Sequence, residues 1–246
     1  ISRYEKGIMR PKRDALQAIA KALNISEAYF DGTNIKIDVP MLRTTSNGNV
    51  SEDELQALEA KLSFWAEQYL AKEKEAGFPT QFKNPIKGTR VSTLEDAIQA
   101  SSLLREMWHC GDGPIASILR LLERKGIMIL AATLPEYVFG MSTWADKKHP
   151  LMILDFNPEK SSVEKLRFTA AHELAHLLLL FPEDSPLKLE KRCDLFACFF
   201  LLPKLALIEE LGSRKRELIT LEEMIDIKEL YGASLAASII AARDYG

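Results

Sequence analysis

The residues most able to do chemistry are two histidines separated by three positions, in His172-Glu-Leu-Ala-His176. On a helix, side chains at i and i+4 lie on one face, so both imidazoles can bind one tetrahedral zinc ion. Glu173 follows the first histidine, where its carboxylate can act as the base toward a water at the metal. The pattern predicts zinc as the cofactor; the alternative is two histidines that serve only packing or solvation on an amphipathic helix.

The segment after this helix must supply a third ligand, because a catalytic zinc has three protein ligands and one open position. No histidine follows His176, so a carboxylate is expected in that role. Glu190 and Asp194 lie one turn apart on a second predicted helix, rich in Phe and Leu. We assign Glu190 as the ligand and Asp194 as the acceptor that orients a histidine N–H. The alternative for Glu190 is an exposed side chain paired with a lysine.

The remaining cysteines and histidines have weaker patterns. Cys193 and Cys198 stand on the same apolar helix, where cysteines usually pack, so ligation is kept as the alternative for them. His109 and Cys110 have no partner at metal-ligand spacing and are expected to be structural or surface residues. His149 belongs to a predicted hairpin and can approach a bound substrate.

The elements that position these residues are mostly helices, and the expected fold class is α+β. Helical periodicity, with capping patterns at Ser51-x-x-Glu54 and Ser92-x-x-Glu95, predicts helices over 14–23, 51–77, 93–109 and 114–125 and further helices from Val163 onward. Three β-prone runs (127–132, 137–144 and 151–156) predict a small, mostly antiparallel sheet, whose last two strands form a hairpin around 146–150. The apolar stripe of helix 51–77 is expected to pack on its own domain, with a homodimer contact as the alternative.

The composition excludes several classes of protein. Hydrophobic residues at 47% and charged residues at 27% exclude a disordered chain. No uncharged apolar run is long enough for a membrane span, and the N-terminus is not a secretory signal. Three cysteines do not form a disulfide framework and fit a reducing compartment. A cytoplasmic protein without a membrane partner is expected.

From about Leu94 to Pro203 the sequence resembles the ImmA/IrrE family of zinc-dependent metallopeptidases. The resemblance rests on Arg-Phe-Thr-x-Ala-His-Glu-Leu-x-His at 167–176, on Glu-x-x-Cys-x-x-Phe-Ala at 190–197 and on Leu-Leu-Pro at 201–203, with shorter matches upstream. It implies a mainly helical, zincin-like peptidase domain over 93–246, and it supports the same three ligands and the same base. Ala175 and Leu180 depart from a frequent Gly and a frequent His of the family, and neither departure removes a ligand.

Residues 1–30 carry six basic and three acidic side chains, in a chain whose net charge is −3. They resemble the second half of a Cro/repressor-type helix-turn-helix domain, beginning inside its recognition helix. The resemblance implies DNA as a partner when the domain is complete. The side chains available for phosphate contacts are Arg3, Lys6, Arg10, Lys12 and Arg13. Residues 31–92 are expected to be a linker that contains the long amphipathic helix.

Together the two resemblances imply a regulatory endopeptidase that cleaves a repressor-type protein and carries a DNA-binding head. Tyr137 and His149 are the candidates for stabilising the oxyanion, and a sheet edge near the metal can take the substrate as an added strand. The alternative function is a transcriptional regulator whose zinc domain senses a signal without cleaving a protein. A structural zinc is disfavoured, because structural sites fill all four positions with Cys and His.

Overall fold

The computed structural model describes residues 4, 9, 11–23, 27, 35–37, 52–77, 81–134, 138–214, 216 and 218–245, without the side chains of 52–55 and 57. The chain divides into two compact units, Ile1–Pro79 and Thr80–Gly246. Among the described helices, none is long and apolar enough to cross a membrane.

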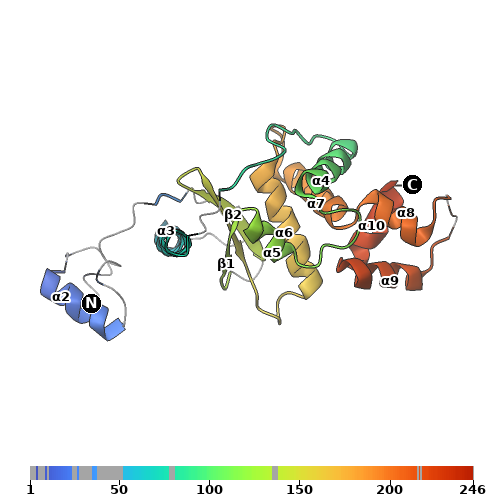
Figure 1. Cartoon of the computed structure of the whole chain (residues 1–246). Helices are drawn as coiled ribbons and strands as arrows, with labels where there is room; N and C mark the ends of the chain where they lie inside the picture. The colour runs from blue at the N-terminus through green and yellow to red at the C-terminus, as the bar shows by residue number, and fades with distance from the viewer. Residues whose placement is uncertain are drawn as a thin grey trace. The chain divides into compact units, whose positions relative to one another are not determined.

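The first unit contains helices α2 (Arg13–Leu23) and α3 (Glu52–Glu75) (Figure 1). Helix α2 buries Ala20 and exposes the basic side chains of Lys12 and Arg13 at its start. In α3, Leu62 and Ala66 are buried one turn apart. The predicted N-terminal cap of this helix, at Ser51, lies outside the described residues.

The second unit combines helices with three short strands, which confirms the α+β class. Its elements are α4 (Leu94–Trp108), α5 (Ile118–Arg124), β1 (Met128–Ala131), β2 (Gly140–Ala145), β3 (His149–Leu154), α6 (Val163–Leu178), α7 (Pro186–Leu201), α8 (Lys204–Leu211), α9 (Leu221–Tyr231) and α10 (Leu235–Tyr245).

The sheet has the strand order β1-β3-β2. Strands β2 and β3 form the predicted antiparallel hairpin, with Ala145 opposite His149. The prediction of a mostly antiparallel sheet is wrong, because β1 pairs parallel to β3, with Met128 opposite Leu151. Strand β1 lies beside β3 rather than beside β2, its neighbour in the chain. The sheet is therefore mixed, with one parallel and one antiparallel pair of strands.

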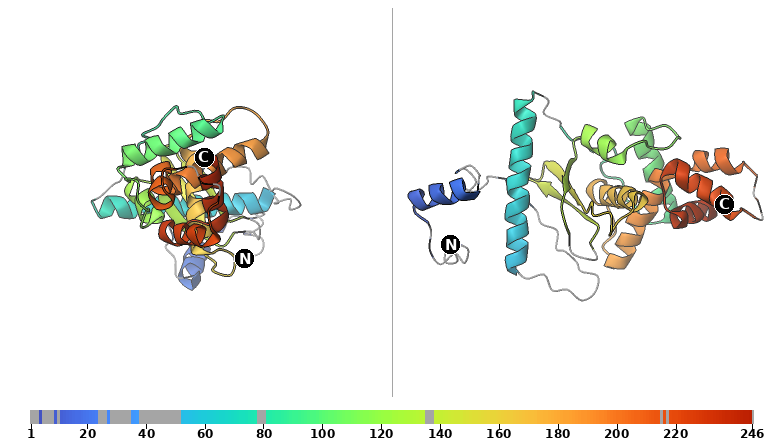
Figure 2. Two further views of the ribbon diagram at one scale, coloured as in Figure 1. Left: turned by 90° about the vertical axis from the view of Figure 1, so that its right-hand side faces the viewer. Right: turned by 90° about the horizontal axis from the view of Figure 1, so that it is seen from below.

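Helix α6 lies between the sheet and α7, since it contacts β2 and β3 on one side and α7 on the other. Figures 1 and 2 show this order, with α8, α9 and α10 at the end of the unit away from the sheet. Helix α4 also packs against α7. The interface around α7 buries three of its phenylalanines completely: Phe196, Phe199 and Phe200.

The chain before α4 also belongs to this unit. The Asn84 side chain donates to the carbonyl of Leu178 at 2.8 Å, and Val91 N–H donates to the carbonyl of Leu180 at 2.9 Å. The predicted linker covered residues 31–92, so its last part lies in the second unit. Helix α4 has its capping box at Thr93 and Asp96, one residue after the predicted Ser92 and Glu95.

Two arginines fasten the helices to the loops around them. Arg105 of α4 donates to the carbonyls of Gly111, Gly113 and Phe200, so it joins α4 to the buried side of α7. Arg167 of α6 donates to three carbonyls in the same way, at Ile115, Tyr231 and Gly232. Carbonyl oxygens replace the water that each guanidinium loses, which stabilises the buried cation of Arg105 and the half-buried cation of Arg167.

Candidate metal centre

Helices α6 and α7 bring five side chains to one place at their interface. Helix α6 supplies His172 and His176, and α7 supplies Glu190, Cys193 and Asp194. The i, i+4 spacing on α6 and the i, i+3, i+4 spacing on α7 place each group of side chains on a single helix face. The packing of the two helices turns these faces toward one another.

The distances between three of these side chains are those of ligands around one ion. The two histidine Nε2 atoms are 3.1 Å apart. Glu190 Oε2 lies 3.0 Å from Nε2 of His172, and Oε1 lies 3.7 Å from Nε2 of His176. Two nitrogen or oxygen ligands of a tetrahedral zinc are about 3.3 Å apart, given bond lengths near 2.0–2.1 Å. The donor types and their spacing therefore fit zinc.

Cys193 also reaches this cluster. One donor atom from each of His172, His176 and Cys193 lies within 4.8 Å of the other two, and such a group could hold a metal ion. The sequence analysis assigned Cys193 to packing, and its side chain is indeed fully buried. Its position among the imidazoles depends on how α7 is rotated against α6, which helical periodicity does not specify.

Asp194 takes the position that an orienting acceptor needs. Its Oδ1 lies 2.8 Å from Nδ1 of His172. When Nδ1 donates to this carboxylate, Nε2 is left as the atom that faces Glu190 and His176. A carboxylate behind a ligating imidazole fixes the tautomer and the ring orientation.

Without a metal, the cluster favours the protonated form of His172. Burial lowers the pKa of His172, but hydrogen bonds to Asp194 and Glu190 outweigh burial and raise that pKa to about 10. The hydrogen bonds from His172 and His176 hold the pKa of Glu190 well below its usual range. The side chains are thus arranged to stabilise positive charge between them.

Glu173 is buried beside the cluster, with 8% of its surface exposed. The Ser142 hydroxyl of β2 donates to its Oε2 at 2.7 Å. Gly140 lets β2 approach α6 closely, because a Cβ there would lie 2.5 Å from the methyl group of Thr169. The sequence analysis missed Ser142, and the alternation of a short strand gives no signal that distinguishes it.

The remaining predicted site residues do not join the cluster within the described structure. His149 is paired with Ala145, three residues along β2 from Ser142, which is about 10 Å at the rise of a strand. No hydrogen bond between described residues links His149 to either histidine of α6. Tyr137 lies outside the described residues.

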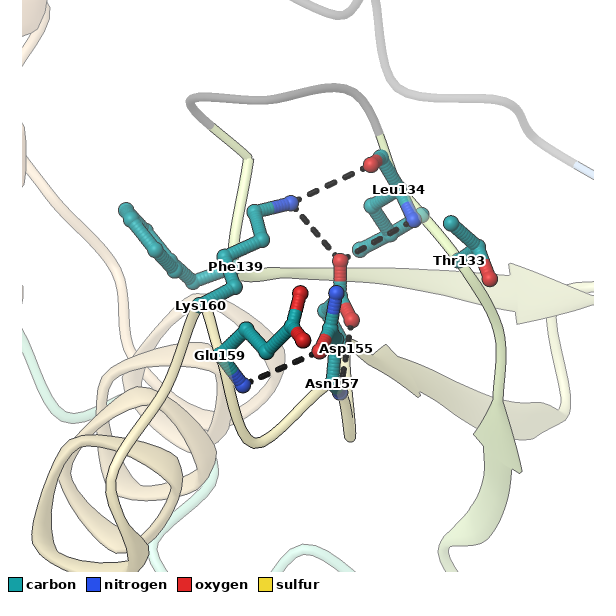
Figure 3. A pocket seen from close by; sticks show the side chains of 7 residues that line it. All are labelled: Thr133, Leu134, Phe139, Asp155, Asn157, Glu159 and Lys160. Atoms are coloured by element: carbon teal, nitrogen blue, oxygen red, sulfur yellow. Dashed lines mark hydrogen bonds and ion pairs between the residues drawn. The ribbon is translucent and has the colours of Figure 1, made fainter.

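A second polar cluster, which the sequence analysis also missed, lines a pocket between the ends of β1 and β3 (Figure 3). Lys160 Nζ lies 2.7 Å from Asp155 Oδ2 and also donates to the carbonyls of Leu134 and Val138. Asp155 accepts further hydrogen bonds from the N–H groups of Leu134 and Asn157. Lysine and aspartate therefore satisfy each other and the loop backbone.

Comparison with known proteins bears on the other unit. A family model described as helix-turn-helix matches residues 1–30. No curated protein matches the chain. Of the predicted phosphate-contacting residues, Lys12 and Arg13 are exposed, while Arg3, Lys6 and Arg10 lie outside the described residues. The match supports a DNA-binding component of a transcription regulator at the N-terminus of this chain.

Proposed function

We propose that this chain is a DNA-linked zinc endopeptidase of the ImmA/IrrE type, acting in the cytoplasm on a repressor-type protein. One observation carries the proposal: two histidines of α6 and a carboxylate of α7 meet at ligand spacing, beside a buried glutamate. A cluster that only bound metal would have no use for that glutamate. The helix-turn-helix match supports the part of the proposal that concerns gene regulation.

In this proposal His172, His176 and Glu190 would hold the zinc, which when bound polarises the scissile carbonyl and makes a water more acidic. Glu173 accepts the proton of the attacking water and returns it to the leaving amine. Ser142 fixes the orientation of this base by donating to Oε2. Asp194 keeps the ring of His172 in its orientation.

Strand β2 offers a place for the substrate backbone. It lies at an edge of the sheet and, among the described strands, pairs with β3 alone. The same strand carries Ser142, which contacts the proposed base. A peptide added along this edge would be held by main-chain hydrogen bonds, which depend little on side-chain sequence.

The second candidate function is a regulator whose metal centre senses a signal without cleaving a protein. Its supporting observation is the buried Cys193, which forms with His172 and His176 a group that could hold a metal ion. Cysteine and histidine ligands together are typical of sites that hold a metal without catalysis.

The test is Glu173→Gln, which keeps the shape of the side chain but cannot accept the proton. The full chain would be incubated with zinc and with a repressor encoded beside its gene, and cleavage would be followed by mass spectrometry. We expect cleavage to fall by about 10²–10⁴-fold with zinc content unchanged. The exposed Glu106→Gln in α4 is the control and should cleave normally. Unchanged cleavage in Glu173→Gln would remove the proposed base, and intact regulation in cells that carry it would favour the sensor.

A further inference from the structure

The thiol of Cys193 is the one group of the cluster for which the peptidase mechanism has no use. The geometry points to Cys193 as a metal ligand that holds the ion from the buried side, with Glu190 as the exchangeable ligand on the solvent side. This inference rests on the proposed metal centre and describes how access to it is controlled. It would hold for a peptidase and for a sensor alike.

Burial and the lack of a partner distinguish this thiol from an ordinary packed cysteine. Cys193 is fully buried, and within the described structure its sulfur makes no hydrogen bond. Cys198, which is also buried on α7, donates its S–H to the carbonyl of Ala237 at 3.2 Å. The sulfur of Cys193 therefore lies near two imidazole nitrogens, whereas the thiol of Cys198 is hydrogen-bonded to the backbone.

The donor types and their helix positions agree with this role. Zinc accepts thiolate sulfur together with imidazole nitrogen and carboxylate oxygen. Glu190 and Cys193 stand at i and i+3 on α7, so both can face one ion bound to α6. On binding, the sulfur–metal bond forms as the S–H bond breaks, and the proton passes to solvent.

The exposure of the two α7 donors decides which one can leave. The Glu190 side chain is 46% exposed, so it can rotate into water without moving the helix. Cys193 has no exposed surface, so its sulfur cannot turn into water as the Glu190 carboxylate can. His172, His176 and Cys193 would then hold the ion from the protein side, and Glu190 would bind or leave the remaining position. A substrate group would have to compete with the Glu190 carboxylate for that position.

Cobalt(II) provides a direct test, because it occupies zinc sites and gives a sulfur-to-metal charge-transfer band in the near ultraviolet only when a thiolate is bound. The full chain would be titrated with Co2+ and bound metal measured by dialysis. We expect one Co2+ per chain with the band in the wild type, in Glu190→Ala and in the control Cys198→Ala. Cys193→Ala and Cys193→Ser should lose the band.

Bound Co2+ without the band in the wild type would overturn the inference and leave the metal centre standing. Loss of the band in Cys198→Ala but not in Cys193→Ala would show that Cys198 supplies the thiolate, and this would also overturn the inference. Loss of Co2+ binding in Glu190→Ala, with the band intact in the wild type, would refute the exchangeable role of Glu190. A normal band in a chain that cleaves no repressor would support Cys193 as a ligand. It would count only against the proposed peptidase function.

Discussion

The second unit contains two clusters of polar side chains, and they differ in how their charges are balanced. In the Asp155–Lys160 cluster, the ammonium group meets one carboxylate and two carbonyls, and the carboxylate meets further N–H donors. In the histidine cluster, atoms that could all accept a proton or a metal face one another at 3.0 to 3.7 Å.

This difference separates a structural network from a binding site. A buried pair that completes its own hydrogen bonds needs nothing from outside the chain. A group of acceptors gathered around one point is stable only with a proton or a cation among them. The balance of hydrogen-bond donors and acceptors is therefore the property that distinguishes the two clusters.

The largest effect is expected from Lys160→Met, which leaves the buried Asp155 without its cation. Breaking such a pair typically costs about 3–5 kcal/mol of unfolding free energy. The double variant Lys160→Met with Asp155→Leu should recover much of that loss, because no charge remains buried. Urea unfolding followed by tryptophan fluorescence would measure both. Zinc bound per folded chain should stay the same, and a Lys160→Met variant as stable as the wild type would refute the structural role.

A smaller, metal-specific effect is expected from Asp194→Asn. The variant weakens the acceptor behind His172, and the loss of such a partner typically lowers metal affinity about 10–100-fold. Asp184→Asn is the matched control. Asp184 precedes α7 and pairs with Arg192 of that helix at 2.8 Å, not with a histidine. Competition with a chromophoric zinc chelator would give both affinities, and equal values would contradict the orienting role.

The smallest effect is expected at the surface pair of Glu164 and Lys228, which are 3.1 Å apart and partly exposed. Glu164→Gln should cost at most about 1 kcal/mol. The Glu164 backbone N–H, Ser162 and Lys228 lower the pKa of this carboxyl from 4.5 to about 2. A lowered pKa stabilises the folded state above pH 4.5, and this contribution is lost as the pH falls toward 2. Thermal unfolding over that range should therefore change less with pH in Glu164→Gln than in the wild type.

Local signals in the sequence predicted the elements that depend on neighbouring residues. The turn after Ala145 predicted the β2–β3 hairpin, and periodicity predicted α6 with its two histidines on one face. The position of β1 could not be predicted, because its pairing with β3 is set by distant contacts and no turn joins the two strands.

The same limit applies to the site. His172, His176 and Glu190 could be proposed as ligands from the sequence, since each lies on a helix with a clear periodic pattern. The approach of Cys193 depends on the rotation between two helices, and the Ser142–Glu173 contact joins a strand to a helix. Asp155 and Lys160 are five residues apart but belong to no recurring motif. Contacts between elements, unlike spacing within them, leave no mark in a single sequence.

The division of the donors between only two helices also limits how this protein can change during evolution. One residue inserted between His172 and His176 would turn the second imidazole by about 100° around α6, away from the first. The same insertion between Glu190 and Asp194 would separate the donors of α7. Residues 179–185 join the two helices and supply no donor. Length variation among descendants of this chain should therefore collect in that connection and be absent from the helices.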